Sequence, residues 1–371
     1  MKAVVVDLDE LVARIKSDHK IQKKVEEPLS INIFTTGADA GNSTTTVNGE
    51  FIFFQVLIDC LLRLKSSQTD KNELIDFCKN QYEGNNYELN NLREFQQAYA
   101  PDKVLLWYTK ESFFYKTLNA ALRTQDIHMI FLFRAFISDI HSQLQKYQAN
   151  NSIQVYRSQL MSSDELNNLQ QNIGQLISVN SFFSASKHRP TALFFLGDTT
   201  VLIDLERVLF EIDADPKMVR SKPFADISSD SEFANESEVL FMLGSIFRLN
   251  SIKRNNDQIW IIQLTLCNDD EHDLKQVLMH MKQQIGRGET NLRILGKLLW
   301  EMGNLDLAEK YLNRFLEQLP PNDPLLRNLY EDLGKLASLR KDFNMSMQWH
   351  QKSLAINSIR KFIEIKFLFL N

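Results

Sequence analysis

The sequence predicts an α+β protein: a helical block, then a mainly antiparallel sheet, then an all-α region of helical hairpins. Apolar residues recur with helical spacing from Glu50 to about Ile140 and again beyond Asp269. Between these regions the sequence changes to short β-branched and aromatic runs separated by turn residues. Helices followed by a run of strands are typical of an α+β domain, whose helices cover part of the sheet.

The composition is that of an ordinary folded protein. Hydrophobic residues make up 44% of the 371 residues and charged residues 24%, with 25 Phe and 12 Gly, which argues against a disordered or fibrous chain. The net charge of −5 provides no basic field for a phosphate backbone, so we expect no nucleic-acid partner. The three cysteines and seven histidines show no disulfide or metal-ligand spacing, which predicts buried reduced thiols and no metal.

The first residues predict a cytoplasmic protein. MKAVVVDLDELVARIKSDHK lacks the order of a signal peptide, and no apolar run approaches the ~20 residues of a membrane-spanning helix. We therefore expect no membrane partner.

Segment 1–30 is predicted to be the remnant of another domain. A short strand at Ala3–Val6 precedes a charged helix to about Lys24, which Pro28 ends. GADAGNS at 37–43 lacks the lysine of a phosphate-binding loop and is interpreted as a polar loop.

The helical block and the sheet follow in that order. Helices are predicted in FIFFQVLIDCLLRL and ESFFYKTLNAALRTQDIHMIFLFRAFI, with polar interruptions near 67–72 and 84–90. The predicted strands are IQVYRS, NSFFSAS, TTVLIDL, VLFEID, EVLFML, IFRLNSI and QIWIIQL, and the sheet should end near Leu266. The domains are thus predicted at 1–30, 31–268 and 269–371.

The last region contains an internal repeat. Leu295-Gly296 recurs as Leu333-Gly334, and Tyr311 is matched by Trp349, so two similar helical hairpins are expected. This pattern resembles tetratricopeptide repeats.

Small residues support that resemblance. Gly296, Ala308 and Pro320 are equally spaced, as tetratricopeptide repeats require where their helices cross. The second hairpin keeps Gly334 but has Ser346 and Ser358 at the other two positions, so it is interpreted as a degenerate or capping copy.

Three segments of the sheet region contain candidate site residues: VYRS at 155–158, SFFSAS at 181–186 and ESEVLFM at 236–242. Alone, an arginine after two strand residues is usually a surface charge, and Ser-Ala-Ser is usually a turn or a helix N-cap. Strand alternation would place Glu236 and Glu238 on one face, where like charges are destabilising. Preorganised carboxylates are instead useful where positive charge develops, which favours a functional site.

In this order the segments resemble the Arg-Ser-Glu class of mono-ADP-ribosyltransferases, which has a strand arginine, a Phe-x-Ser-Thr-Ser motif and Glu-x-Glu. The matching residues are Arg157, 182–186 and 236–238. The resemblance extends from about Phe51 to Leu266, and includes Trp107, Tyr108, Thr109, Tyr115, Asn119, Arg123 and KPFADIS. It implies a helical lobe on a mixed, mainly antiparallel two-sheet core.

The resemblance also implies roles around NAD, with NADP as an alternative co-substrate. Arg157 would bind the phosphates, and the backbone of Ser158, where the family commonly has Gly, would hold the nicotinamide amide. Ser184 would support the nicotinamide ribose and orient Glu238, and Ser186 keeps the third motif position, whereas Ala185 replaces the usual threonine.

The two glutamates have different implied roles. Glu238 would hydrogen-bond a ribose hydroxyl and stabilise the oxocarbenium-like state. Glu236 would orient the guanidinium of an acceptor protein that presents an exposed arginine. The preceding polar turn, with Phe233, would help to recognise that acceptor, although Phe233 is equally consistent with packing.

Two alternatives remain open. An NAD glycohydrolase would use the same residues with water as acceptor, but the intact Glu236 favours arginine. An inactive transferase-like protein would instead bind a peptide or protein through its repeats, and Ser158 and Ala185 support that interpretation.

Overall fold

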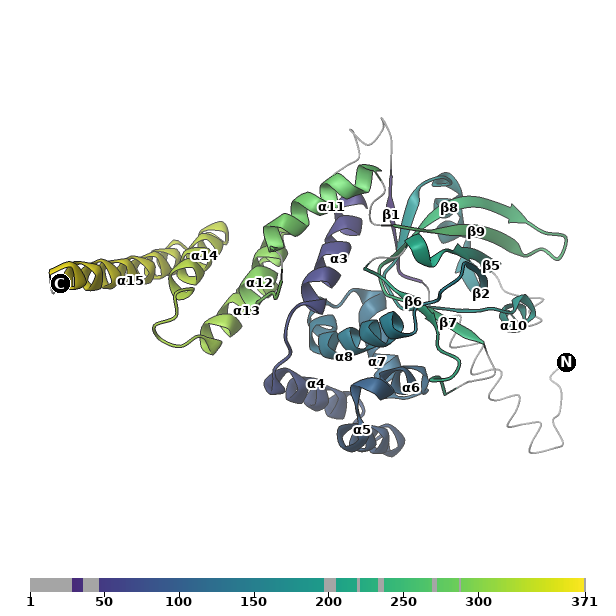
Figure 1. Ribbon diagram of the computed structural model, residues 1–371, viewed down its shortest axis with the longest axis horizontal. Coiled ribbons are helices and arrows are strands. Elements are labelled where there is room, and N and C mark those ends of the chain that lie inside the picture. Colours follow the sequence, from purple (N-terminus) through teal and green to yellow (C-terminus); the bar gives the residue numbers. More distant parts are fainter. Residues whose placement is uncertain are drawn as a thin grey trace. The chain divides into compact units, whose positions relative to one another are not determined.

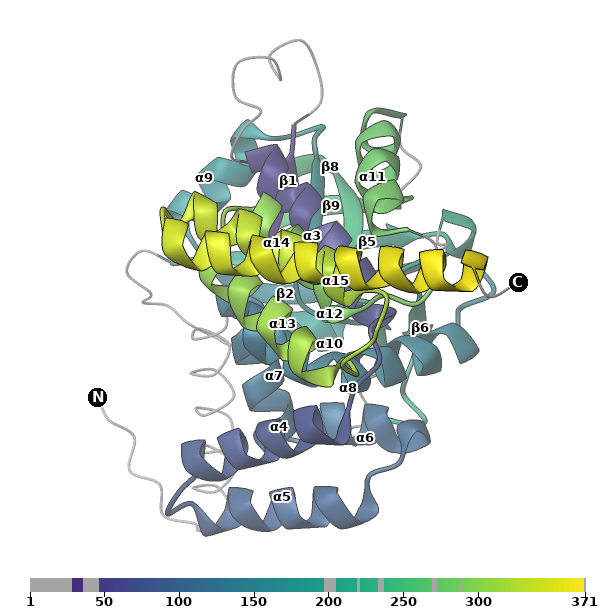
Figure 2. The ribbon, with the colours of Figure 1, turned by 90° about the vertical axis from the view of Figure 1, so that its left-hand side faces the viewer.

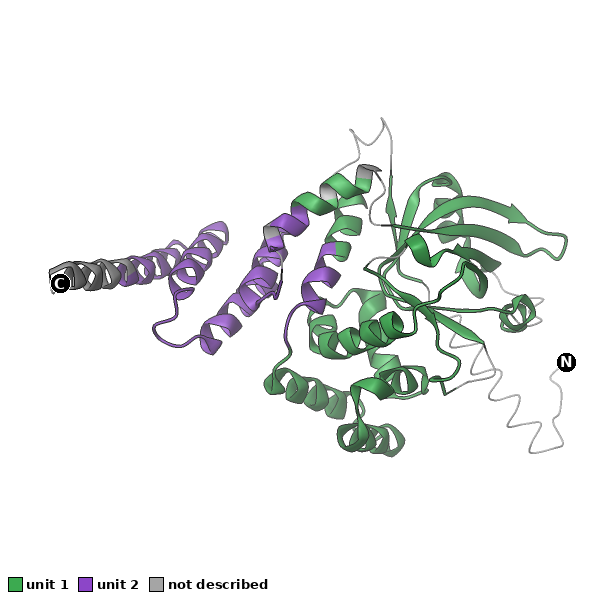
Figure 3. Ribbon diagram, viewed as in Figure 1, with its two compact units in different colours: residues 1–55, 66–280 green, residues 56–65, 281–371 purple. Residues whose placement is uncertain are grey.

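The computed structural model describes residues 29–35, 47–196, 205–218, 221–232, 237–268, 272–286 and 288–369. The chain divides into two compact units, one of residues 1–55 and 66–280 and one of residues 56–65 and 281–371 (Figure 3). The strand and helix predicted within residues 1–30 fall on positions 1–28, which lie outside the described residues. The loop GADAGNS and all but the last residue of TTVLIDL also lie outside them.

The predicted helical block is confirmed (Figure 1). Its elements are α3 (Val47–Leu62), α4 (Gln68–Gln81), α5 (Asn86–Ala98), η1 (Pro101–Lys103), α6 (Val104–Thr109), α7 (Phe113–Thr124) and α8 (Ile127–Lys146). Helices α4 and α5 run side by side (Figure 2). An aromatic cluster joins the helices, because the ring of Phe95 lies 4.8 to 5.4 Å from those of Tyr99, Trp107, Phe113, Phe114 and Phe136.

The polar stretches near 67–72 and 84–90, predicted as interruptions, mostly belong to helices. Ser67 and Asp70 form a capping box, in which the Ser67 hydroxyl accepts from the Asp70 amide and the Asp70 carboxylate accepts from the Ser67 amide. Asn85 accepts from the amide of Glu88 at the start of α5. The polar side chains thus accept hydrogen bonds from amides in the first turns of α4 and α5, so the non-helical segments before these helices are short.

The sheet is mainly antiparallel, as predicted, and its nine strands follow the order β1-β3-β8-β9-β5-β2-β4-β7-β6. β5 and β9 are the parallel pair. The strands are β1 (Ile31–Phe34), β2 (Ile153–Ser162), β3 (Leu176–Val179), β4 (Phe183–Ser186), β5 (Leu205–Ala214), β6 (Phe224–Asp226), β7 (Glu238–Phe241), β8 (Ser245–Arg254) and β9 (Trp260–Cys267). Helices α9 (Ser163–Gln171) and α10 (Arg189–Phe194) and the 3₁₀ turn η2 (Pro216–Met218) lie between strands.

The strands form one continuous curled sheet, where two sheets were expected. The join between β2 and β4 is narrow, since Tyr156 opposite Ser186 is the pair that links these strands. β4 is only four residues long, and it is the strand through which β7 and β6 join the rest of the sheet. The resulting order places Tyr156 within β2, the end of β4 and the start of β7 next to one another.

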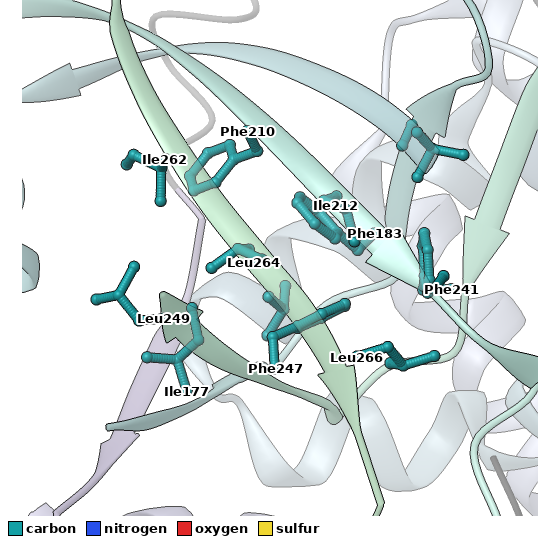
Figure 4. Close-up of a cluster of buried hydrophobic side chains, with 14 of the residues drawn as sticks. Ile177, Phe183, Phe210, Ile212, Phe241, Phe247, Leu249, Ile262, Leu264 and Leu266 are labelled. Carbon is teal, nitrogen blue, oxygen red and sulfur yellow. The ribbon is translucent and has the colours of Figure 1, made fainter. Parts of the chain in front are cut away.

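The sheet has an apolar core on one face (Figure 4). The ring of Phe183 lies 5.9 Å from that of Phe210, 6.2 Å from Phe241 and 5.8 Å from Phe247. These rings are fully buried, and burial of such side chains is the main stabilising contribution to the sheet.

The predicted helical hairpins are present in the second unit. Its helices are the end of α11 (His272–Ile285), α12 (Leu292–Glu301), α13 (Leu305–Gln318), α14 (Leu326–Leu339) and α15 (Phe343–Phe369). α12 packs against α13 and α14 against α15. A Cβ atom at Gly296 would lie 2.9 Å from Leu312 Cδ2 and 3.2 Å from the Ala308 carbonyl oxygen. The small residues therefore lie at a helix crossing; the assignment to tetratricopeptide repeats stays a prediction.

The cysteines are buried, as predicted: Cys60 and Cys78 are buried free thiols, and Cys267 is buried as well. Burial raises the pKa of the Cys60 thiol to about 11, so it is inert at neutral pH. In the described part of the chain, no helix combines the length and apolar character needed to cross a bilayer.

Candidate active site

Three adjacent strands bring the candidate residues together. Arg157 lies on β2, Ser184 on β4 and Glu238 at the first position of β7. β4 pairs with β2 on one side and with β7 on the other, and Ser186 stands opposite Glu238. The narrow join of the sheet is therefore where these side chains meet.

In the Arg157 guanidinium, Nη1 is held by a hydrogen bond and Nε is an unused donor. Nη1 donates to the Ser184 carbonyl oxygen at 2.8 Å, and the guanidinium carbon lies 5.3 Å from the centre of the Phe183 ring. Nε is buried and has no hydrogen-bond partner. Arg157 forms no ion pair with any described carboxylate, so its positive charge is not neutralised within that part of the chain.

Both carboxylate oxygens of Glu238 accept hydrogen bonds from serines. The Ser184 hydroxyl donates to Oε1 at 2.6 Å, and the Ser231 hydroxyl donates to Oε2 at 3.1 Å. Hydrogen bonds to a carboxylate are roughly twice as strong as those between neutral groups. The geometry thus holds the Glu238 side chain in one orientation.

Ser158 and Ser186, the other predicted cofactor contacts, bond to the chain itself. The Ser158 hydroxyl is buried and donates to the Ala192 carbonyl oxygen of α10. Alternation along β2 places this side chain on the opposite face from Arg157, so the serine side chain does not narrow the space at Arg157. The Ser186 hydroxyl accepts from the His188 amide at 3.1 Å.

The helical lobe contributes Tyr108 to the site. Its hydroxyl donates to Asn119 Oδ1 at 3.2 Å, and its ring lies 5.0 Å from that of Phe182. Burial, followed by the neighbouring Tyr115, raises the pKa of Tyr108 well above its usual value, and the charges of Glu238 and Arg157 also act on it. Tyr108 is therefore a neutral hydrogen-bonding group near the side chains of Arg157 and Glu238.

A turn before β7 contacts both the sheet and the helical lobe. The Ile227 amide donates to the Glu238 carbonyl oxygen at 2.9 Å, and the Glu232 amide donates to Thr109 Oγ1 at 2.9 Å. Sequence reasoning missed Ser231 in this turn, because a serine among polar turn residues has no distinguishing pattern.

Glu236 and Phe233 lie outside the described residues. β7 begins at Glu238, and the preceding Ser237 has φ 48°, in the left-handed region. The extended backbone of β7 therefore begins at Glu238, and the placement of Glu236 on the same face as Glu238 stays a prediction.

The comparisons with known proteins agree with this arrangement. Residues 90–272 match the family model described as NAD:arginine ADP-ribosyltransferase, a range that includes Arg157, Ser184 and Glu238. This part of the chain, just under half of its length, is therefore similar to ADP-ribosyltransferases. A search of curated proteins gave no match.

Solved ADP-ribosyltransferases are similar to this domain at low identity. The Vis toxin from Vibrio splendidus is 21% identical, with 57% of this chain and 91% of that chain covered and a TM-score of 0.36. HopU1 of Pseudomonas syringae is 14% identical, with 55% and 99% covered and a TM-score of 0.37. The C3 exoenzyme of Clostridium limosum is 14% identical, with 52% and 94% covered and a TM-score of 0.36.

Within the described ranges, no three His, Cys, Asp or Glu side chains come close enough to one another to hold a metal ion. The described side chains that meet at the site are those of Arg157, Glu238 and two serines, Ser184 and Ser231.

Proposed function

We propose that the chain transfers ADP-ribose from NAD to arginine side chains of an acceptor protein. In this reaction the bond between C1′ of the ribose and the nicotinamide nitrogen breaks, and nicotinamide leaves with the bonding electrons. An arginine nitrogen forms the new bond to C1′ and loses a proton. The observation that carries the proposal is the Ser184–Glu238 hydrogen bond of 2.6 Å next to Arg157, within the matched domain.

Arg157 is suited to bind the two phosphates of NAD. A guanidinium is permanently charged and offers a planar set of donors that matches phosphate oxygens. One donor, Nη1, is used by the Ser184 carbonyl, which orients the group. The unpartnered Nε and the absence of an ion pair to described carboxylates leave its charge available for an anion.

Glu238 is the proposed catalytic carboxylate. Positive charge develops on the ribose as nicotinamide leaves, and a preorganised carboxylate stabilises that charge without reorganising at the moment of reaction. The Ser184 hydroxyl fixes Oε1, so this part of the arrangement exists before NAD binds. We further propose that the uncharged side chain of Tyr108 lines the site, since burial raises its pKa well above its usual value.

Arginine is the proposed acceptor. The family description names arginine, and Glu236 supplies a carboxylate two residues before Glu238 that would orient a guanidinium and take its proton. NADP remains an alternative co-substrate. The hairpins of α12 to α15 are proposed to be tetratricopeptide-like and to bind a peptide or protein.

The test is turnover of labelled NAD by the full chain with agmatine, a small guanidine, as acceptor. We expect ADP-ribosyl-agmatine from the wild type and a loss on the order of 10²- to 10³-fold in Glu238→Ala, as for other preorganised electrostatic groups. Glu236→Gln should lose transfer to agmatine but still release ADP-ribose into water. Glu83→Ala, which changes an exposed residue of a turn, is the matched control.

The products separate the alternatives. Free ADP-ribose without labelled agmatine from the wild type would identify an NAD glycohydrolase. Folded wild type that leaves NAD unchanged with every acceptor would contradict an enzymatic role and direct attention to the hairpins. Retained turnover in Glu238→Ala would contradict the assigned carboxylate.

A further inference from the structure

The second serine on the catalytic carboxylate has no counterpart in the matched motifs. Ser231 is buried in the turn before β7, and its hydroxyl donates to Glu238 Oε2 at 3.1 Å. Resting on the proposed function, we infer that Ser231 is a positioning residue: it fixes the plane of the Glu238 carboxylate and couples that carboxylate to the turn 227–232.

The argument begins with the freedom of a glutamate side chain. A carboxylate that is held at one oxygen still rotates about its terminal bond, because that torsion is broad and has no sharp staggered wells. Ser184 alone fixes only Oε1. A second donor on Oε2 removes the remaining rotation.

The turn that carries Ser231 is itself anchored. The Ile227 amide donates to the Glu238 carbonyl oxygen at 2.9 Å, and the Asp230 amide donates to the Ile227 carbonyl oxygen at 2.9 Å. At the other end, Thr109 Oγ1 of α6 accepts from the Glu232 amide at 2.9 Å. The hydroxyl of Ser231 therefore belongs to a fixed segment, which is what a positioning role requires.

The same contacts connect the carboxylate with the segment that precedes Glu236. The turn is tied to Thr109 on one side and to Glu238 on the other, so a change in the turn changes the orientation of the carboxylate. Displacement of this turn by an acceptor would act on Glu238 through Ser231.

The experiment compares Ser231→Ala, Ser231→Thr and Ser229→Ala in the full chain. Ser229 lies in the same turn, and its hydroxyl donates to Asp230 rather than to Glu238, so Ser229→Ala is a matched loss of a hydroxyl. For each protein, kcat and KM for NAD are measured for both agmatine modification and NAD hydrolysis. Thermal unfolding verifies that all variants are folded.

We expect Ser231→Ala to lower kcat by about tenfold in both reactions, the effect of one hydrogen bond to a charged group, while KM for NAD changes less than about twofold. Ser231→Thr restores most of kcat because the hydroxyl is kept, and Ser229→Ala matches the wild type. A general loss of structure would instead change KM and the unfolding temperature.

Amide hydrogen exchange gives a second measurement that needs no turnover. Without NAD, Ser231→Ala and Glu238→Ala should both accelerate exchange over residues 227–232, whereas Ser229→Ala should not, since only the first two remove the same contact. Wild-type kinetics in Ser231→Ala with unchanged exchange would overturn the positioning role while leaving the proposed function intact. A wild type without turnover would overturn the proposed function and, with it, any role of Ser231 in that reaction.

Discussion

At the scale of single residues, the surroundings of Arg157 fix its guanidinium, as the proposed binding of an anion requires. One nitrogen is committed to a backbone carbonyl and the ring of Phe183 lies 5.3 Å from the guanidinium carbon. These contacts fix the plane of the guanidinium before an anion binds, and a planar fork loses less rotamer entropy per hydrogen bond than an ammonium on a flexible stem.

Replacement of Arg157 by lysine tests this preparation. Arg157→Lys should raise KM for NAD by about tenfold or more and change kcat less, because lysine keeps the charge but cannot make paired, planar contacts with phosphates. The measurement is the initial rate against NAD concentration at saturating agmatine. Arg248→Lys is the control, since Arg248 also donates to a carbonyl oxygen, that of Gly174. Equal KM values for the wild type and Arg157→Lys would argue against phosphate binding.

The sequence predicted part of this site and missed the rest for a physical reason. Arg157, Ser184 and Glu238 were selected from residue type and order. Their contacts depend on β2, β4 and β7 being neighbours, which no local pattern specifies. Ser231 reaches Glu238 from a turn whose residues are ordinary for turns, so its contact with Glu238 is evident only in the folded structure.

At the scale of elements, most strands lie within the predicted runs and three short strands do not. The long strands β2, β5, β8 and β9 coincide with apolar runs, and the four-residue strands β4 and β7 lie within the longer runs NSFFSAS and EVLFML. β1, β3 and β6 are four, four and three residues long, and no alternating pattern marks them in the sequence. All residues of β3 are buried, so buried and exposed residues do not alternate along that strand.

The crossing of α12 and α13 gives the prediction at this scale. Gly296→Ala should lower the free energy of unfolding by about 1–3 kcal/mol, as overpacking of a core does, because its Cβ would meet Leu312 Cδ2 at 2.9 Å. Gly49→Ala in α3 is the control: no atom lies within 4 Å of its Cβ, so helix propensity should make it neutral or stabilising. Denaturant unfolding measures both, and equal values would contradict the close crossing.

At the scale of the whole molecule, the compact units do not follow a single cut in the sequence. Residues 56–65 belong to the same unit as residues 281–371. Within that unit, Thr290 Oγ1 donates to the Cys60 carbonyl oxygen at 2.8 Å, and Arg63 Nη1 donates to the carbonyl oxygens of Gly286 and Gly288 at 2.9 Å. The predicted boundary at 268 would separate these partners.

Truncation at that boundary tests the consequence. A fragment of residues 29–268 should aggregate or unfold at a lower temperature than the full chain, because Cys60 and Arg63 lose the hydrogen bonds that they make with Thr290, Gly286 and Gly288. A fragment of residues 29–321 keeps the contacts at Gly286, Gly288 and Thr290 together with α12 and α13, so it should not aggregate. Size-exclusion chromatography and thermal unfolding distinguish the two. A monomeric 29–268 fragment with the unfolding temperature of the full chain would show that the second unit contributes nothing to the stability of α3, and that the boundary drawn from the sequence is sufficient for folding.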